Sequence, residues 1–412
     1  MLRQLVLGEI CVCSAEQSLL YCGVIFADMS KAFDRVAHSA LIQSLHDTGI
    51  RDVALNWFCS YLSDRIQTVR VDQELGQSRP CSRGVPQGSV LGPVLFCIYI
   101  RDITPCFRFS QDQEYADDIA FYVRHSDCDT VLERLTADLA ALDSYLTGKG
   151  LVLNPDKTQF LLLRRPTSPL PTTVSISCRN STLYPAHTAK YLGLIVDEHL
   201  AFDAQVERVC IAVKQKVGAY KHARQNLNHR ARRLFYLSII QSTLEYASSA
   251  YINCLSHRSY NQLITASRTS LKRIFALDCR TPTETLYAYT KIYTLEQRLN
   301  FKQYVFVFRC LHGLSSPLLS LLFTPRCTGP HSAATTRGQA TAALVLPACH
   351  SRYGFHSIAY LGADRWNALP PSCRLAESPA LFRAHTKSHL GFPVKRQRLL
   401  GLPQSKIIKS TT

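Results

Sequence analysis

The sequence lacks any uninterrupted apolar run of the roughly 20 residues that a membrane-spanning helix requires. The longest candidate, residues 90–100, is shorter and is interrupted by Gly92 and Pro93. A secretory signal peptide is not indicated either, because Glu9 breaks the apolar run that follows Arg3. We therefore expect an intracellular protein with no membrane contact.

Cysteine pairs with C-x-x-C spacing are also missing. The chain has 16 cysteines, but none form a C-x-x-C pair, and the nearest two are Cys11 and Cys13. Structural zinc sites and the disulfide frameworks of small secreted proteins both depend on regular cysteine spacing. We expect reduced thiols, most of them buried.

Acidic side chains are scarce in the second part of the chain. Residues 1–165 carry 16 basic and 20 acidic side chains, a net charge of −4, whereas residues 166–412 carry 31 and 10, a net charge of +21. This asymmetry is typical of chemistry in the first part and polyanion binding in the second. A solvated basic surface explains the charge equally well.

Hydrophobic residues make up 46% of the sequence, so 412 residues can bury a core and form two or three domains. Before residue 165 the pattern alternates between strands and helices, and after residue 200 it is mainly helical, which predicts an α+β fold followed by α-helices. The expected strands are 19–27, 119–123, 173–178 and 191–196; the expected helices cover 38–62, 130–147 and a segment from about 203; loops are expected at 164–171 and 328–343.

Three aspartates stand next to predicted strands. Asp28 follows the apolar run 19–27, and Asp117 and Asp118 precede the strand 119–123. Adjacent carboxylates repel each other, and a divalent cation relieves that repulsion. On neighbouring strands they could hold two metal ions roughly 3.5–4 Å apart, as in-line phosphoryl transfer requires. An Asp-Asp pair alone, however, more often caps a helix or lies in a turn.

The segments around these aspartates form an ordered set. Residues 26–36, 82–93 and 115–118 resemble, in order, the first catalytic motif, the Gln-Gly motif and the catalytic aspartate box of reverse transcriptases. Residues 150–158 and 190–194 resemble the next motif and the primer grip. The order and completeness of the set favour the catalytic interpretation over the structural one.

The subfamily resemblance is to the enzymes of non-LTR (LINE-type, Jockey-like) retrotransposons. It lies in Trp57, Tyr61, Leu62 and Arg65, ahead of residues 82–93. Near the carboxyl end, residues 365–371 and 382–390 are similar to the tail of such elements.

The resemblance implies a right-hand polymerase: residues 1–200 as palm with primer grip, 201–265 as a basic helical thumb, and 266–412 as a helical extension of unknown role. Only 27 residues precede Asp28, so we expect most of the fingers to be absent and the chain to be an amino-terminally truncated copy.

Specific roles follow from the resemblance. Asp28, Asp117 and Asp118 would bind two Mg²⁺ ions, for which Mn²⁺ can substitute, and Lys157 would neutralise the leaving pyrophosphate. Phe33 would exclude a ribose 2′-hydroxyl; the alternative, less favoured within this motif, is a core side chain of the following helix. The remaining assignments are Gln87, Gly88 and Tyr115 to the nucleotide pocket; Tyr191, Leu192 and Gly193 to the primer grip; and Lys214, Lys221, Arg224, Arg230, Arg232 and Arg233 to duplex phosphates.

The implied activity is RNA-directed DNA synthesis, the extension of a primer 3′-hydroxyl with deoxynucleotides. The expected partners are an RNA template, a DNA primer, dNTPs and the RNA of the element itself, in a ribonucleoprotein of the nucleus or cytoplasm. The alternative is an inactive retrotransposon remnant that only binds nucleic acid. A metal phosphohydrolase would not explain Phe33, Gln87 and Gly88 or the primer-grip segment.

Overall fold

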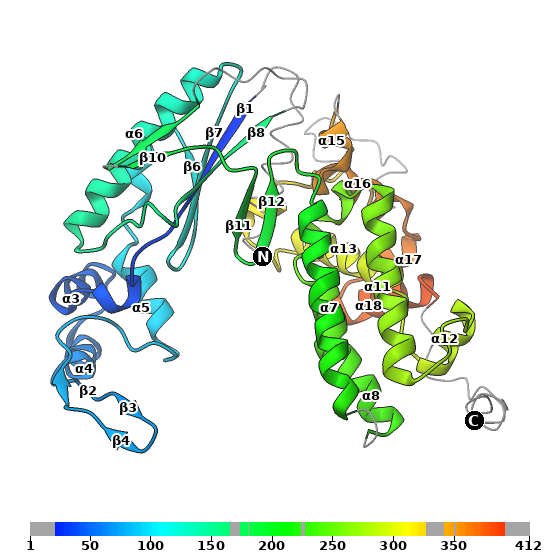
Figure 1. Cartoon of the computed structure of the whole chain (residues 1–412). Helices are drawn as coiled ribbons and strands as arrows, with labels where there is room; N and C mark the ends of the chain where they lie inside the picture. Colours follow the sequence, from blue (N-terminus) through cyan, green and yellow to red (C-terminus); the bar gives the residue numbers. More distant parts are fainter. Residues whose placement is uncertain are drawn as a thin grey trace.

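A four-stranded antiparallel sheet, which we call the palm sheet, organises the first part of the molecule (Figure 1). The computed structural model describes residues 21–164, 174–179, 181–223, 227–326, 342–349 and 352–391. Most of the two predicted loops lies outside these residues. The strands of the palm sheet, in spatial order, are β6 (Gln111–Tyr115), β7 (Asp118–His125), β1 (Tyr21–Ala27) and β8 (Gln159–Arg164).

Strand β1 is buried at every position because both faces of the palm sheet are covered. Its even-numbered side chains, such as Val24 and Phe26, belong to one hydrophobic core, and its odd-numbered side chains, such as Ile25, belong to another. This division follows from the two-residue period of a strand. It explains why the sequence shows a continuous apolar run rather than an alternating pattern.

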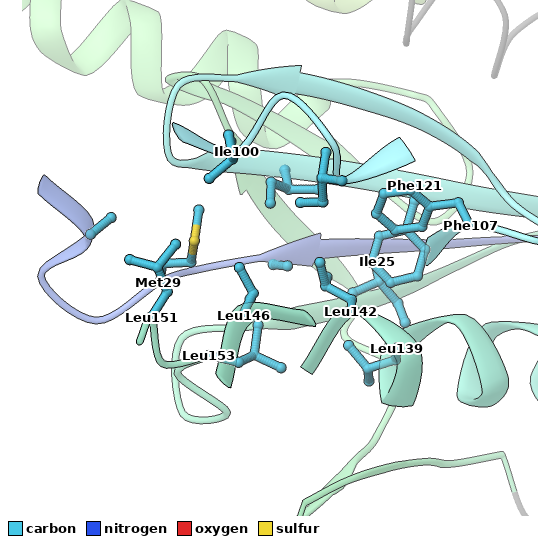
Figure 2. Packing of buried hydrophobic residues seen from close by; sticks show 14 of the residues in the cluster. Ile25, Met29, Ile100, Phe107, Phe121, Leu139, Leu142, Leu146, Leu151 and Leu153 are labelled. Carbon is cyan, nitrogen blue, oxygen red and sulfur yellow. The ribbon is translucent and has the colours of Figure 1, made fainter. Parts of the chain in front are cut away.

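Helix α6 (Cys128–Gly148) covers one face of the palm sheet. The side chain of Asp127 caps the helix by accepting a hydrogen bond of 2.8 Å from the Thr130 amide. Figure 2 shows Leu139, Leu142 and Leu146 of this helix pointing toward the sheet. The same core includes α2 (Ala32–Arg35), α3 (His38–Asp47) and α5 (Gly92–Tyr99).

The helix predicted over residues 38–62 is two helices. Helix α3 ends at Asp47 and α4 begins at Asp52 (Asp52–Leu62), with Gly49 between them at a φ of +94°. A left-handed residue of this kind ends a helix, and glycine adopts it without strain. An exposed ribbon follows α4, made of β2 (Ile66–Gln67), β3 (Arg70–Val71), β4 (Glu74–Leu75) and β5 (Arg79–Pro80).

The other face of the palm sheet carries a β-hairpin and helices (Figure 1). The prediction of one continuous strand over residues 191–196 is wrong, because a tight turn at Leu192 and Gly193 separates two paired strands. These strands are β11 (Thr188–Tyr191) and β12 (Leu194–Asp197), and a smaller pair is formed by β9 (Ile176–Cys178) and β10 (Ser181–Leu183).

The helices on this face, which we call the thumb helices, share a core with the palm sheet. They are α7 (Asp203–Ala223), α8 (His229–Phe235), the π-helical turn η3 (Tyr236–Gln241), α9 (Ser242–Glu245), α10 (Ser248–Tyr251) and α11 (His257–Phe275). The expected domain boundary at residue 265 lies inside α11, which packs along α7.

Helix α13 (Leu295–Leu311) joins this core to a third one. Its first half contributes Leu295 and Leu299 to the core shared with the palm sheet, and its second half contributes Phe306 and Phe308 to the third core. The other helices after α11 are α12 (Thr283–Thr290), α14 (Pro317–Ser320), α15 (Arg352–His356), α16 (Ile358–Ala368), α17 (Pro371–Arg374) and α18 (Pro379–His389).

Trp366 and Asn367, in the tail motif, have structural roles. The Trp366 indole donates a hydrogen bond of 2.9 Å to the Ala342 carbonyl, and the Asn367 side chain pairs with both backbone groups of Leu344. They hold residues 342–345 in place. Within the described part of the chain, no helix has the length and apolar character needed to cross a membrane. The sheet and helices confirm the predicted α+β polymerase fold.

Candidate nucleotidyl-transfer site

Asp28 and Asp117 lie at the same end of the palm sheet. Ala27, the last residue of β1, pairs with Ile119 of β7, so Asp28 comes level with Asp118. Tyr115 and Asp118 close the β6–β7 hairpin, with Ala116 and Asp117 as its turn. The sheet therefore brings Asp28 to the same end as Asp117 and Asp118, which lie about 90 positions later in the sequence.

The backbone on both sides of Asp28 is held by the segment 150–158. The Asp28 amide donates a hydrogen bond of 3.3 Å to the Thr158 hydroxyl, and the Asn154 amide donates one of 2.8 Å to the Asp28 carbonyl. Met29 pairs with Leu153, and Figure 2 shows its side chain beside Leu151 and Leu153. This segment thus fixes the backbone position of Asp28.

The Asp28 carboxylate has an orphaned atom. Its Oδ2 is buried and has no hydrogen-bond partner. A buried, unpaired carboxylate oxygen is costly, and a cation would satisfy it. Among the residues that the structure describes, no three Asp, Glu, His or Cys side chains are close enough to enclose a metal ion. Proteins can also bind Mg²⁺ through one or two carboxylates together with substrate phosphates, and the unpaired Asp28 oxygen has the chemistry of such a ligand.

The turn that carries Asp117 is strained. Ala116 has a φ of 56°, in the left-handed region that non-glycine residues rarely adopt. Strain of this kind costs on the order of 1 kcal/mol and is concentrated at functional sites. Asp117 is half-buried beside this residue, whereas Tyr115 and Asp118 are exposed.

The Gln-Gly loop is bonded to the segment that follows Asp28. The Val85 amide donates a hydrogen bond of 2.9 Å to the Phe33 carbonyl, and Gln87 donates one of 2.8 Å to the Asp34 carboxylate. Gly88 has a φ of +78° and open space where a side chain would be, so backbone can approach a ligand there. Both residues are exposed, as a substrate-facing loop requires.

The position of Phe33 is compatible with both roles predicted from the sequence, packing in the core and exclusion of a ribose 2′-hydroxyl. Its ring stacks on the buried Phe96 ring with centroids 4.8 Å apart, yet the side chain is only half-buried. One face of the ring is thus fixed by packing while the other part remains accessible. Lys157 is exposed in the segment that holds Asp28.

The predicted primer grip is the β11–β12 turn. Leu192 and Gly193 have φ values of 47° and 76°, as a two-residue type I′ turn requires. Tyr191 is buried, and its ring stacks on Phe26, 4.9 Å away between centroids. Tyr191 therefore positions the turn relative to the strand that precedes Asp28, while Leu192 and Gly193 form its tip.

Two residues that the sequence analysis did not identify hold this turn. Arg208 of α7 donates a hydrogen bond to the Gly193 carbonyl, and Tyr246 donates one of 2.7 Å to the Leu192 carbonyl. Both line a groove of about 410 Å³ that also includes Lys216. No local pattern reveals these residues, because they lie 15 and 54 positions from their partners.

The predicted phosphate-binding cations differ in availability. Lys214 and Arg230 are exposed. Arg232 and Arg233 are half-buried and donate to the backbone carbonyls of Leu227 and Lys291. They stabilise the helix ends as well as supplying charge. The Lys221 side chain and all of Arg224 lie outside the described residues.

Strand β6 carries a second acidic pair near the aspartate turn. Burial, together with the neighbouring Asp112 carboxyl, raises the pKa of Glu114 to about 7. Burial also raises the pKa of Asp112. The two side chains share a hydrogen bond, so one of them holds a proton near neutral pH.

Comparisons with known proteins show which family the chain is similar to. Residues 3–196 match the sequence model of the family described as reverse transcriptase (RNA-dependent DNA polymerase). The chain is 27% identical over 291 residues to the probable RNA-directed DNA polymerase from transposon BS of Drosophila melanogaster, covering 68% of this chain and 32% of the relative. It is 28% identical over 261 residues to that from mobile element jockey of the same species, covering 60% and 28%.

The chain therefore spans about a third of the length of the curated relatives it matches. Among solved structures, apo telomerase from Candida tropicalis aligns with a TM-score of 0.36 and 13% identity, covering 66% of this chain and 45% of that one.

Proposed function

Because residues 3–196 match the sequence model of the reverse transcriptase family and the chain is similar to polymerases of non-LTR retrotransposons, we propose that the chain extends a primer 3′-hydroxyl with deoxynucleotides on an RNA template. The observation that carries the proposal is the orphaned Asp28 Oδ2 beside the aspartate turn. A carboxylate oxygen left buried without a partner is costly for folding, so a role in binding accounts for it.

Asp28 and Asp117, with Asp118 adjacent, would hold Mg²⁺. When bound, such ions neutralise phosphate charge and lower the pKa of the attacking hydroxyl. The chain itself supplies orientation: Thr158 and Asn154 fix the backbone of Asp28. We propose two Mg²⁺ ions, with Mn²⁺ as a substitute.

The neighbouring residues would shape the nucleotide pocket. Phe33, supported by Phe96, would occupy the space of a ribose 2′-hydroxyl. Gln87 and Gly88 would line the pocket beside it, and Tyr115 would flank it at the aspartate turn. Lys157, exposed next to Thr158, would neutralise charge on the leaving pyrophosphate.

The β11–β12 turn would hold the primer end. Hydrogen bonds from Arg208 and Tyr246 hold the tip residues Leu192 and Gly193. Stacking of Tyr191 on Phe26 holds the turn against the palm sheet. Lys214 and Arg230 would then bind duplex phosphates. These contacts are independent of sequence, as an enzyme that copies any template requires. The partners proposed are the element's own RNA as template in a ribonucleoprotein, a DNA primer and dNTPs, in the nucleus or cytoplasm.

Primer extension on a homopolymer RNA template with a DNA primer tests the proposal. We expect Mg²⁺-dependent synthesis by the purified chain and none by Asp117→Ala. Binding of the primer–template without synthesis would instead support the alternative function, a remnant that only binds nucleic acid.

A further inference from the structure

Helix α4 and the turn after it carry a ladder of two aromatic rings and a guanidinium, formed by Trp57, Tyr61 and Arg65. The Trp57 and Tyr61 rings, one helical turn apart on α4, are stacked with centroids 5.3 Å apart and an interplanar angle of 10°. Arg65 follows three residues after the helix ends at Leu62. Its guanidinium lies 5.2 Å from the Tyr61 ring centroid and also donates to the Tyr61 carbonyl.

Trp57 lies outside the core, whereas the half-buried Tyr61 packs partly against it. Trp57 is 52% exposed, although tryptophan is normally well buried, and Leu62 is the fully buried side chain of α4. Packing of α4 against its neighbours therefore leaves one face of the Trp57 indole open to solvent. The proposed synthesis reaction, as argued above, does not use this ladder.

The ribbon after α4 adds cations. Arg65, Arg70, Arg79 and Arg83 are exposed, and none forms an ion pair with any described carboxylate. The same stretch also carries three acidic side chains, Asp64, Asp72 and Glu74, so four positive charges against three leave a net charge of +1. Binding by net charge alone would be weak here, so ring stacking must supply much of any affinity.

The ladder is connected to the proposed site by backbone pairing. The Arg65 carbonyl accepts a hydrogen bond of 2.7 Å from the Cys81 amide. Arg83 pairs with Ala37, directly after the segment that carries Phe33. Figure 1 shows α4 and the ribbon together at one end of the molecule, next to α3 and α5.

We propose that Trp57, Tyr61 and Arg65 form a stacking surface for the unpaired bases of a single-stranded nucleic acid, with the ribbon arginines on its phosphates. Exposed aromatic rings beside arginines are the chemistry by which proteins bind single strands, since every base has a stacking face. The inference rests on the proposed function, in which the strand is the unpaired template beside the synthesis site.

Fluorescence anisotropy of the full chain with labelled single strands tests the proposal. We expect Trp57→Ala to weaken binding of a 12-residue oligo(U) by about 5- to 100-fold, and Trp57→Phe to restore most of the affinity. Tyr184→Ala is the matched control, because Tyr184 is another exposed aromatic side chain (69%) remote in sequence from the ladder. It should leave the affinity unchanged.

An abasic strand separates stacking from charge. Oligo(dT) should show the same dependence on Trp57, whereas a tetrahydrofuran strand with the same phosphates should bind weakly and equally to the wild type and Trp57→Ala. Equal dependence on Trp57 for both strands would contradict a stacking role.

Intrinsic fluorescence gives a direct readout. The chain has two tryptophans, and Trp366 is 1% exposed in the third core. Oligo(U) should quench the Trp57 emission, and Trp57→Phe should abolish the quenching while leaving the Trp366 emission in place. Intact Trp366 emission shows that the third core is folded, and the circular dichroism spectrum and melting temperature of the variant check the rest of the chain.

The outcomes separate this inference from the proposed function. A wild type that extends primers while Trp57→Ala leaves affinity and quenching unchanged would overturn the inference alone, and would indicate a protein partner on this face. A wild type that shows Trp57-dependent binding but no extension would overturn the proposed function and support the inference.

Discussion

The Tyr246 hydroxyl donates a hydrogen bond of 2.7 Å to the Leu192 carbonyl at the tip of the β11–β12 turn. The same hydroxyl lies 3.2 Å from the point where a side chain on Gly193 would begin. One thumb residue therefore both bonds to the turn and limits the residues that fit there.

Removing this hydroxyl should loosen the proposed primer grip. A single hydrogen bond contributes about 0.5–1.5 kcal/mol, so we expect Tyr246→Phe to reduce primer extension roughly 2- to 10-fold with only a small change in thermal stability. Steady-state extension kinetics at varied primer–template concentration measure this reduction. Extension equal to that of the wild type would show that the turn needs no such support.

Neutralising Asp28 should separate activity from stability. Asp28→Asn keeps the shape of the side chain but removes the charge from a carboxylate whose Oδ2 is buried and unpartnered. We expect primer extension to fall by at least about 100-fold while the melting temperature stays equal or rises. A variant that is both inactive and clearly less stable would instead indicate a structural role for Asp28.

Shortening Phe33 should relax sugar selection. In Phe33→Ala the ring that stacks on Phe96 is lost, and we expect incorporation of ribonucleotides relative to deoxynucleotides to increase by about 10-fold or more. Competition between the two nucleotide types in one extension reaction gives the ratio. Phe96→Leu is the control for lost packing, since it disturbs the same stack but leaves Phe33 in place.

Duplex binding should depend on salt through specific cations. Lys214 and Arg230 are exposed, so replacing either by alanine should lower the slope of log K against log salt by about 1 if each contacts one phosphate. Arg233→Ala should mainly lower stability, because its guanidinium donates to the Lys291 carbonyl. Unchanged slopes for Lys214→Ala and Arg230→Ala would place the duplex elsewhere.

Stability should fall as pH rises from about 4.5 to 7. The pKa of Glu114 is raised to about 7 by burial and by Asp112, so the folded state holds a proton that the unfolded state has already released. After allowance for partial exposure, the loss is on the order of 1–2 kcal/mol. Urea unfolding of the wild type and Glu114→Gln across this range measures it, and the variant should show a flatter profile. Parallel profiles would assign the proton to another group.

Sequence patterns correctly predicted the helices and strands whose pattern of burial stays the same along their whole length. Strand β1 was recognised from its unbroken apolar run, and α6 from leucines spaced for one face. The prediction failed where two neighbouring elements share one hydrophobic pattern. Helices α3 and α4 were predicted as one helix, although Gly49 in the sequence indicated a break between them. Likewise, apolar residues on both sides of Gly193 concealed the β11–β12 turn.

The sequence pointed to the aspartates of the candidate site but not to the residues that hold its backbone in place. The resemblance identified Asp28 and Asp117, whereas the bonds from Arg208, Tyr246 and Thr158 join residues 15, 54 and 130 positions apart. Such pairs leave no periodic pattern in a single sequence, because they depend on how separate elements pack. The backbone bracing of Asp28 by the 150–158 segment belongs to the same class.

Strand β1 places alternate side chains in two cores, one with α6 and the other with the thumb helices. If recombination exchanged the thumb helices between two related genes, the side chains on one face of β1, far away in the sequence, would have to change as well to pack against the new helices. The third core contains no β1 side chain and joins the rest through α13. A crossover just after α13 would leave the shared faces of β1 intact, so an exchanged tail would need to match only the α13 side chains of the third core.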